Sequence, residues 1–202
     1  MPLVEIRDLT IAETGAAAGV LGRGMRDNPI HVRAFGPRPD RRQGALTQMF
    51  EGLLRLDVSK GAILGAFSAG TLVGVCAMVE PHRCQPTLLE KLQLLPAVLG
   101  GSGLAGTARV LRWVAGWARH DPAEAHWHLG PVGVERHLQG QGIGSALLQV
   151  FCDRVDALRA LAYLETDKPE NVRFYERSGF RVRGQESVLG VPSWFMARPA
   201  AG

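Results

Sequence analysis

Apolar residues recur along the chain with two different periods, and each period predicts one kind of element. Alternating or continuous apolar runs predict strands over 4–7, 62–67, 71–79, 127–134, 163–166, 180–182 and 193–197. Spacings of three and four residues predict helices from Thr10 to near Gly22, over 42–56, over 142–161 and over 171–178. Thr10 and Glu13 have the spacing of a capping box. The pattern therefore predicts a mixed chain of helices and strands.

Residues 81–125 fit this scheme less directly. Leucines over 88–99 and apolar residues over 110–117 predict two helices, and Gly100-Gly101-Ser102-Gly103 predicts the break between them. The segment contains no repeat and no low-complexity tract. We therefore place no domain boundary in it and expect residues 1–202 to form a single domain.

The strand over 127–134 contains Pro131, which has no backbone N–H for a ladder hydrogen bond. Proline is tolerated in a strand at a bulge, where that hydrogen bond is already lost. The sequence therefore predicts that this strand is bulged or splayed.

Composition narrows the class of protein. The 202 residues are 46% apolar, which is enough for a sizeable core. The net charge of +4 comes almost wholly from scattered arginines, so we expect no nucleic-acid partner. Three cysteines in no metal-like spacing are expected to be reduced thiols. We see no leader and no apolar run approaching the ~20 residues that span a bilayer, so we expect a cytoplasmic protein without a membrane partner.

Three alternating glycines follow the proline-containing strand and open the 142–161 helix. The stretch Gln139-Gly140-Gln141-Gly142-Ile143-Gly144 lets backbone N–H groups converge on an anion at a helix N-terminus. No lysine follows as in a Walker loop, and Leu147 occupies the place of the third glycine of a dinucleotide fingerprint. The loop is thus predicted to bind a phosphate of another kind.

A second motif, Asn171-x-x-Phe174-Tyr175-x-x-x-Gly179-Phe180, follows at a fixed distance. Together with the glycine loop it resembles the GNAT superfamily of acyl-CoA-dependent N-acetyltransferases, over about residues 60–198. The resemblance implies an α+β, three-layer fold with a mixed, mostly antiparallel twisted sheet of about six to seven strands, splayed at 127–134 and flanked by helices. Leu164-Glu165-Thr166 and Trp194 to Arg198 are similar to the branch that includes puromycin N-acetyltransferase. Residues 81–125 would then shape the acceptor side.

The resemblance implies acetyl-CoA as cosubstrate and a small-molecule amine as acceptor, in a monomer or homodimer. The backbone of the bulged strand would bind the pantetheine arm, the glycine loop the pyrophosphate, and the 171–178 helix further parts of CoA. The residues that these roles cover are Val132, Gly133, Val134, Gln139, Gly140, Gln141, Gly142, Ile143, Gly144, Ser145, Asn171 and Phe174.

Acetyl transfer needs a neutral amine and a proton for the leaving thiolate. Tyr175 stands where the family commonly has its general acid. His128 and Glu80 are the candidate general bases, since the first has a pKa near neutrality and the second ends a strand near the expected cleft. Glu165 is a third carboxylate whose role stays open, and a chain of waters would serve without a dedicated base.

Other interpretations of several residues are weighed on the sequence alone. His126 and His128 share a strand face, but no acidic or cysteine partner stands at ligand spacing, so we expect no metal. Trp113, Trp117 and Trp127 either line an aromatic pocket or pack in the core. Glu165 lies some twenty residues beyond the glycines, as in an NAD(P)-dependent oxidoreductase, and the fold would also suit a non-catalytic acyl-CoA-binding module.

Overall fold

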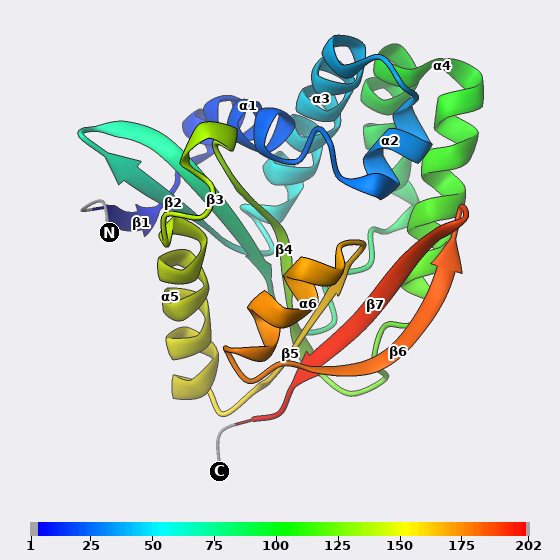
Figure 1. The fold of residues 1–202 in the computed structure, drawn as a ribbon. Helices are drawn as coiled ribbons and strands as arrows, with labels where there is room; N and C mark the ends of the chain where they lie inside the picture. Colours follow the sequence, from blue (N-terminus) through cyan, green and yellow to red (C-terminus); the bar gives the residue numbers. More distant parts are fainter. Residues whose placement is uncertain (1–3, 201–202) are drawn as a thin grey trace.

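A computed structural model describes residues 4–200 as one mixed sheet with helices on both faces (Figure 1). The strand order is β1-β2-β3-β4-β5-β7-β6, and every neighbouring pair is antiparallel except β4 and β5. The strands are β1 (Glu5–Asp8), β2 (Gly61–Ser68), β3 (Thr71–Val79), β4 (His126–Val134), β5 (Leu161–Thr166), β6 (Arg181–Val188) and β7 (Val191–Arg198). The predicted mixed, mostly antiparallel sheet is confirmed.

The helices form two outer layers. They are α1 (Thr14–Gly24), α2 (Pro29–Phe35), α3 (Pro39–Asp57), α4 (Leu88–Ala118), α5 (Ile143–Ala157) and α6 (Pro169–Glu176), with short 3₁₀ turns at η1 (Ile11–Glu13) and η2 (Arg136–Leu138). Because side chains alternate along a strand, neighbouring residues of β2 enter different cores. Ile63 packs with α1 to α4, whereas Leu64 packs with α5 and α6.

Strand β4 is both bulged and splayed, as predicted. Cys76 pairs with Val132 and Met78 with Leu129, so Gly130 and Pro131 together face a single residue of β3. On its other side β4 pairs with β5 only from His126 to His128. Beyond His128 that edge of β4 has no strand partner, although Val134 O accepts a hydrogen bond from the Gln139 side chain.

Two proline-started helices differ from the sequence analysis. Helix α2, which begins at Pro29, was not predicted, and Pro39 begins α3 ahead of the expected start at residue 42, because proline suits the first turn of a helix. The prediction of two helices over 88–117 with a break at Gly100–Gly103 is confirmed, because the two helical stretches of α4 meet at Gly103, whose φ of 66° and ψ of 179° are not helical. A Cβ on Gly101 would lie 2.8 Å from Ala45 Cα, so this glycine allows α4 to approach α3 closely.

Helix α4 also bears on the membrane prediction. By length and composition alone it would suffice to cross a bilayer, contrary to the expectation that no apolar run approaches that length. In the structure α4 packs against α2 and α3. Residues 1–3 and 201–202, which include the start of the expected leaderless N-terminus, lie outside the described residues.

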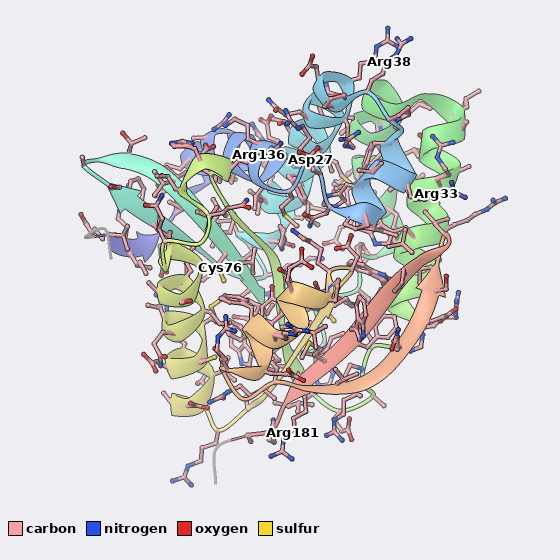
Figure 2. All side chains as sticks on the ribbon, viewed as in Figure 1. Asp27, Arg33, Arg38, Cys76, Arg136 and Arg181 are labelled. Atoms are coloured by element: carbon pink, nitrogen blue, oxygen red, sulfur yellow. The ribbon has the colours of Figure 1, made fainter. Side chains whose placement is uncertain are left out.

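Charged residues and cysteines are distributed as expected. Figure 2 shows Arg33, Arg38 and Arg181 at separate edges of the molecule, rather than in one basic stripe. The three cysteines are free. Burial raises the pKa of the Cys76 thiol, which lies inside the fold, and raises that of Cys152 to about 11.

Candidate active site

Two cavities meet at the splayed strand. The larger, of about 430 Å³, lies between the end of β4, the start of α5 and α6. The smaller, of about 250 Å³, lies between β4, β5 and helices α2, α3 and α4. The residues that line both are Met25, Asn28, Val132, Asn171 and Tyr175. The arrangement suits two ligands that approach each other from opposite sides.

The larger cavity contains most of the predicted CoA-binding residues. Those lining it are Val132, Gly133, Val134, Gln139, Gly140, Gly142, Gly144, Ser145, Asn171 and Phe174. Gly142 is the N-cap of α5 with φ 88°, a backbone conformation that favours glycine. The first N–H groups of α5 have no partner within the helix and so favour an anion at this end.

Gln141 and Ile143 are not among the lining residues. Ile143 is only 2% exposed because its side chain packs in the core beneath α5. The Gln139 side chain has a role that the sequence did not predict, since its Nε2 donates to Gly24 O (2.9 Å) and Val134 O (3.0 Å). It thereby ties the glycine loop to α1 and β4.

Sequence reasoning missed several residues of this cavity. Lys168 and Arg177 line it and bring positive charge close to the glycine loop. Both flank the Asn171 motif in sequence, so a search for cations near that motif would have found them. The other additional lining residues are Gly24, Met25, Asn28, Leu138 and Glu170.

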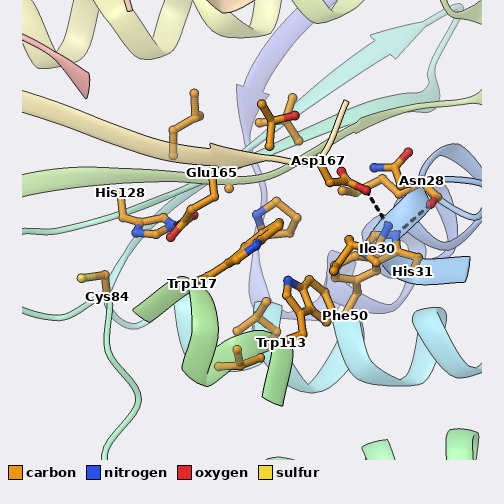
Figure 3. Close-up of a pocket in the computed structure, with 18 of the residues that line it drawn as sticks. Asn28, Ile30, His31, Phe50, Cys84, Trp113, Trp117, His128, Glu165 and Asp167 are labelled. Carbon is orange, nitrogen blue, oxygen red and sulfur yellow. Dashed lines mark hydrogen bonds and ion pairs between the residues drawn. The ribbon is translucent and has the colours of Figure 1, made fainter. Parts of the chain in front are cut away.

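The smaller cavity has an aromatic wall. Trp113 and Trp117 of α4 line it with their rings edge to face at 5.2 Å, and His31 of α2 packs against Trp113 at the same distance (Figure 3). Phe50 of α3 completes the wall. Trp127 instead packs in the core beside α5. Of the three tryptophans, two therefore line a pocket and one packs in the core.

Carboxylates stand at the opposite side of this cavity. Glu165 Oε2 lies 3.1 Å from His128 Nε2, and both residues line the cavity. Burial lowers the pKa of His128, but the Glu165 carboxylate, together with Cys84 and Asp121, outweighs burial and places that pKa well above its usual value. Asp167 accepts a hydrogen bond from the Ile30 backbone N–H at 2.7 Å, at the start of α2.

Tyr175 stands where the two cavities join. Its ring is 7% exposed and packs edge to face against Phe174 (5.0 Å) and Phe180 (5.9 Å). Burial raises its pKa above the usual range for tyrosine, so the phenol stays protonated. The geometry allows a proton donor at the junction.

Glu80, the other candidate base, lies elsewhere. It follows β3, is paired with Arg83 at 3.3 Å with its side chain 46% exposed, and is not among the residues lining the two cavities. The structure thus brings His128 and Tyr175 to the cavities but not Glu80.

The sequence analysis found no cysteine or acidic partner for the strand histidines, but the folded chain brings both kinds of residue beside them. Cys84, from the loop before α4, and Asp121, from the loop after it, lie beside His126 and His128. Burial raises the pKa of the Cys84 thiol, but hydrogen bonding to the imidazoles outweighs burial and brings it to about 7. The sequence could not reveal this because the partners are 42 and 5 residues from His126.

Comparison with known proteins agrees with the fold and the two cavities. The model of the acetyltransferase (GNAT) family matches residues 30–180. The chain belongs to this family and is an acyltransferase.

Similar solved structures extend over nearly the whole chain. A Corynebacterium glutamicum protein described as a histone acetyltransferase HPA2 and related acetyltransferase is 25% identical, with 98% of this chain and 97% of that one covered and a TM-score of 0.75. The Thermoplasma acidophilum PaiA N-acetyltransferase in complex with coenzyme A is 12% identical, with 98% and 99% covered and a TM-score of 0.61. The Drosophila melanogaster polyamine N-acetyltransferase is 13% identical, with 98% and 100% covered and a TM-score of 0.64.

The oxidoreductase alternative is thereby excluded. A doubly wound dinucleotide-binding fold requires a mostly parallel sheet, whereas β4 and β5 are the one parallel pair among the described strands. The family match also accounts for Asn171 to Phe180, which that alternative left unexplained.

Proposed function

We propose that the protein transfers an acetyl group from acetyl-CoA to the primary amine of a small molecule, by direct attack on the thioester in a ternary complex. The observation that carries the proposal is the junction of the two cavities at Tyr175. A donor in one cavity and an acceptor in the other would bring thioester and amine together, which removes much of the entropic cost of the reaction.

Acetyl-CoA is assigned to the larger cavity. The pyrophosphate would accept hydrogen bonds from the backbone at Gly142 to Ser145, with Lys168 and Arg177 close by. The pantetheine amides would pair with the free edge of β4 at Val132 to Val134. The coenzyme A complex of the Thermoplasma structure supports acetyl-CoA as donor.

The acceptor is assigned to the smaller cavity. Its aromatic wall suits a flat or apolar body, and Glu165 with Asp167 provides negative charge for an ammonium group. Such an amine fits the resemblance to the puromycin N-acetyltransferase branch. Similar structures include an agmatine N-acetyltransferase and a polyamine N-acetyltransferase, so amines without an aromatic group also belong in the test.

The reaction needs two proton movements. The ammonium group loses a proton to the His128–Glu165 pair, whose carboxylate faces the cavity, and the neutral amine attacks the thioester carbonyl. When the C–S bond breaks, the Tyr175 hydroxyl donates its proton to the leaving thiolate. Glu80 is the weaker candidate for the base because it lines neither of the two cavities and pairs with Arg83.

A screen of amines with a thiol-release readout tests the proposal. Aromatic amines, diamines, amino sugars and peptide N-termini are each incubated with acetyl-CoA, and products are identified by mass spectrometry. Acetylation of a small amine with a kcat/KM well above that for peptides is expected. Tight acetyl-CoA binding without turnover on any amine would favour the non-catalytic module, and exclusive turnover on peptides would refute a small-molecule acceptor. Cytoplasmic location and the monomer or homodimer remain predictions.

A further inference from the structure

Four side chains with metal-binding atoms converge beside the acceptor cavity. Cys84 lies between β3 and α4, Asp121 lies between α4 and β4, and His126 and His128 extend from β4. One ligand atom from each lies within 4.8 Å of each of the others. Figure 3 shows Cys84 on one side of the His128 ring and Glu165 beside that ring.

The distances within the cluster fit tetrahedral zinc. Cys84 Sγ lies 3.6 Å from Asp121 Oδ2 and 3.7 Å from His126 Nε2. Zinc bonds of about 2.3 Å to sulfur and about 2.0–2.1 Å to nitrogen or oxygen imply ligand separations of roughly 3.3–3.6 Å. Ordinary adjustment of the side chains would bring the four atoms onto one ion.

Both imidazoles are already oriented by an outer partner. His126 Nδ1 lies 2.8 Å from the Glu124 carbonyl oxygen, and His128 Nε2 lies 3.1 Å from the Glu165 carboxylate. Metal-binding histidines usually donate their other ring N–H to a carbonyl or carboxylate in this way. The remaining nitrogens, His126 Nε2 and His128 Nδ1, are the ones available to a metal.

Two atoms of the cluster lack any partner among the described residues. His128 Nδ1 and Asp121 Oδ1 are buried and make no hydrogen bond. Leaving such atoms unpaired costs about 1–3 kcal/mol each, so each calls for an explanation. A bound cation would satisfy His128 Nδ1 directly, and Asp121 Oδ1 belongs to the carboxylate whose Oδ2 lies 3.6 Å from Cys84 Sγ.

We propose that Cys84, Asp121, His126 and His128 form a zinc site. Cys84 binds as the thiolate and releases its proton to solvent when the metal enters. Because the protein supplies four ligands, the site is closed and structural rather than catalytic. It fastens the loops at both ends of α4 to β4 and so fixes one wall of the acceptor cavity.

A zinc ion at this site would also define the role of His128 in the proposed reaction. With Nδ1 on the metal and Nε2–H donated to Glu165, the imidazole has no free position for a proton. Glu165 would then be the proton acceptor and His128 a positioning residue. The zinc assignment itself stands on the cluster alone and does not depend on the acyl donor or acceptor.

Binding of the metal alone tests the assignment. The 202-residue chain is stripped of metal with a chelator, dialysed and titrated with Zn²⁺ or Co²⁺. We expect one ion per chain, a higher Tm, and for Co²⁺ a thiolate charge-transfer band with the intense visible bands of a tetrahedral site. A chain that binds much less than one ion, or a cobalt spectrum without the thiolate band, would overturn the proposal.

Single substitutions distinguish the proposed zinc ligands from a cysteine outside the cluster. Cys84→Ser should remove the charge-transfer band and weaken binding by at least about 100-fold. Asp121→Asn should weaken binding yet keep the band, and this second variant remains informative if Cys84→Ser fails to fold. Cys152→Ala is the control, since this thiol lies on α5 in the opposite core, and it should bind as the wild type does. Unchanged cobalt binding and spectrum in Cys84→Ser would overturn the site.

Discussion

Removal of one hydroxyl group, in Tyr175→Phe, tests the chemistry most directly. The ring is nearly buried between Phe174 and Phe180, so phenylalanine preserves this packing and should leave the fold intact. Only the hydroxyl group of a residue that lines both cavities is lost. Any change in turnover therefore reports what that oxygen does.

The expected magnitude separates two roles. A general acid contributes about 10²–10⁴-fold in rate, or about 2.7–5.4 kcal/mol. A neutral hydrogen bond that only positions a ligand contributes about 0.5–1.5 kcal/mol, or roughly 2- to 13-fold. We expect kcat to fall by at least about 100-fold. Because burial raises the pKa of Tyr175 and keeps it protonated, the wild-type pH profile should show no limb from this group below pH 9.

Thiol release at saturating concentrations of both substrates measures kcat, and calorimetry measures acetyl-CoA affinity, which should stay within about threefold of wild type. Tyr163→Phe is a matched control, because Tyr163 is the other tyrosine, is buried at 1% exposure and lines neither cavity. Removal of the Tyr163 hydroxyl should leave kcat within a few-fold of the wild-type value. If Tyr175→Phe also leaves kcat within about threefold, the acid role is refuted.

Three further predictions concern stability and the donor site. Burial raises the pKa of Asp57 to about 7, so the folded chain binds a proton that the unfolded chain has lost between roughly pH 4 and 7, and stability falls across that window. In urea unfolding, the stability of Asp57→Asn relative to wild type should rise by about 3 kcal/mol from pH 4 to 7, and a difference that stays constant with pH would contradict this prediction. Leu147→Ala, at a fully buried position, should cost about 2–5 kcal/mol in the same assay, against about 0.5 or less for exposed Leu158→Ala; similar costs would contradict the packing. Gly142→Val, at φ 88°, should weaken acetyl-CoA binding by at least about tenfold in calorimetry, whereas Gly190→Val, at φ 78° in the β6–β7 turn, should not; retained affinity would move the phosphate site elsewhere.

Local chemistry made parts of the fold predictable. Thr10 and Glu13 form the predicted capping box because both partners lie within one turn. Pro131 predicted the bulge in β4 because a residue without an N–H cannot complete the ladder there. The β2–β3 hairpin follows from its turn, where Ala69 and Gly70 both have positive φ.

Packing decided what the local signals left open. The glycines over 100–103 interrupt α4 at Gly103 as predicted, and Gly101 also lets α4 lie close against Ala45 of α3, which the sequence did not reveal. Pro29 is a helix start as well as a helix breaker, and the choice depends on what precedes it and on the Asp167 carboxylate that caps Ile30 from across the fold.

The proposed donor site and the proposed acceptor site also differ in how far the sequence predicts them. The sequence alone predicted the side that we propose for CoA, because backbone N–H groups of one glycine loop and one short helix make most of it, and their positions follow from contiguous motifs. Only the tertiary structure decided the side that we propose for the acceptor. There, Glu165 meets His128 from a neighbouring strand, the tryptophans of α4 cover the cavity, and Cys84 and Asp121 join the strand histidines from separate loops. Such side-chain clusters depend on how distant segments pack, and no spacing along one chain encodes that distance.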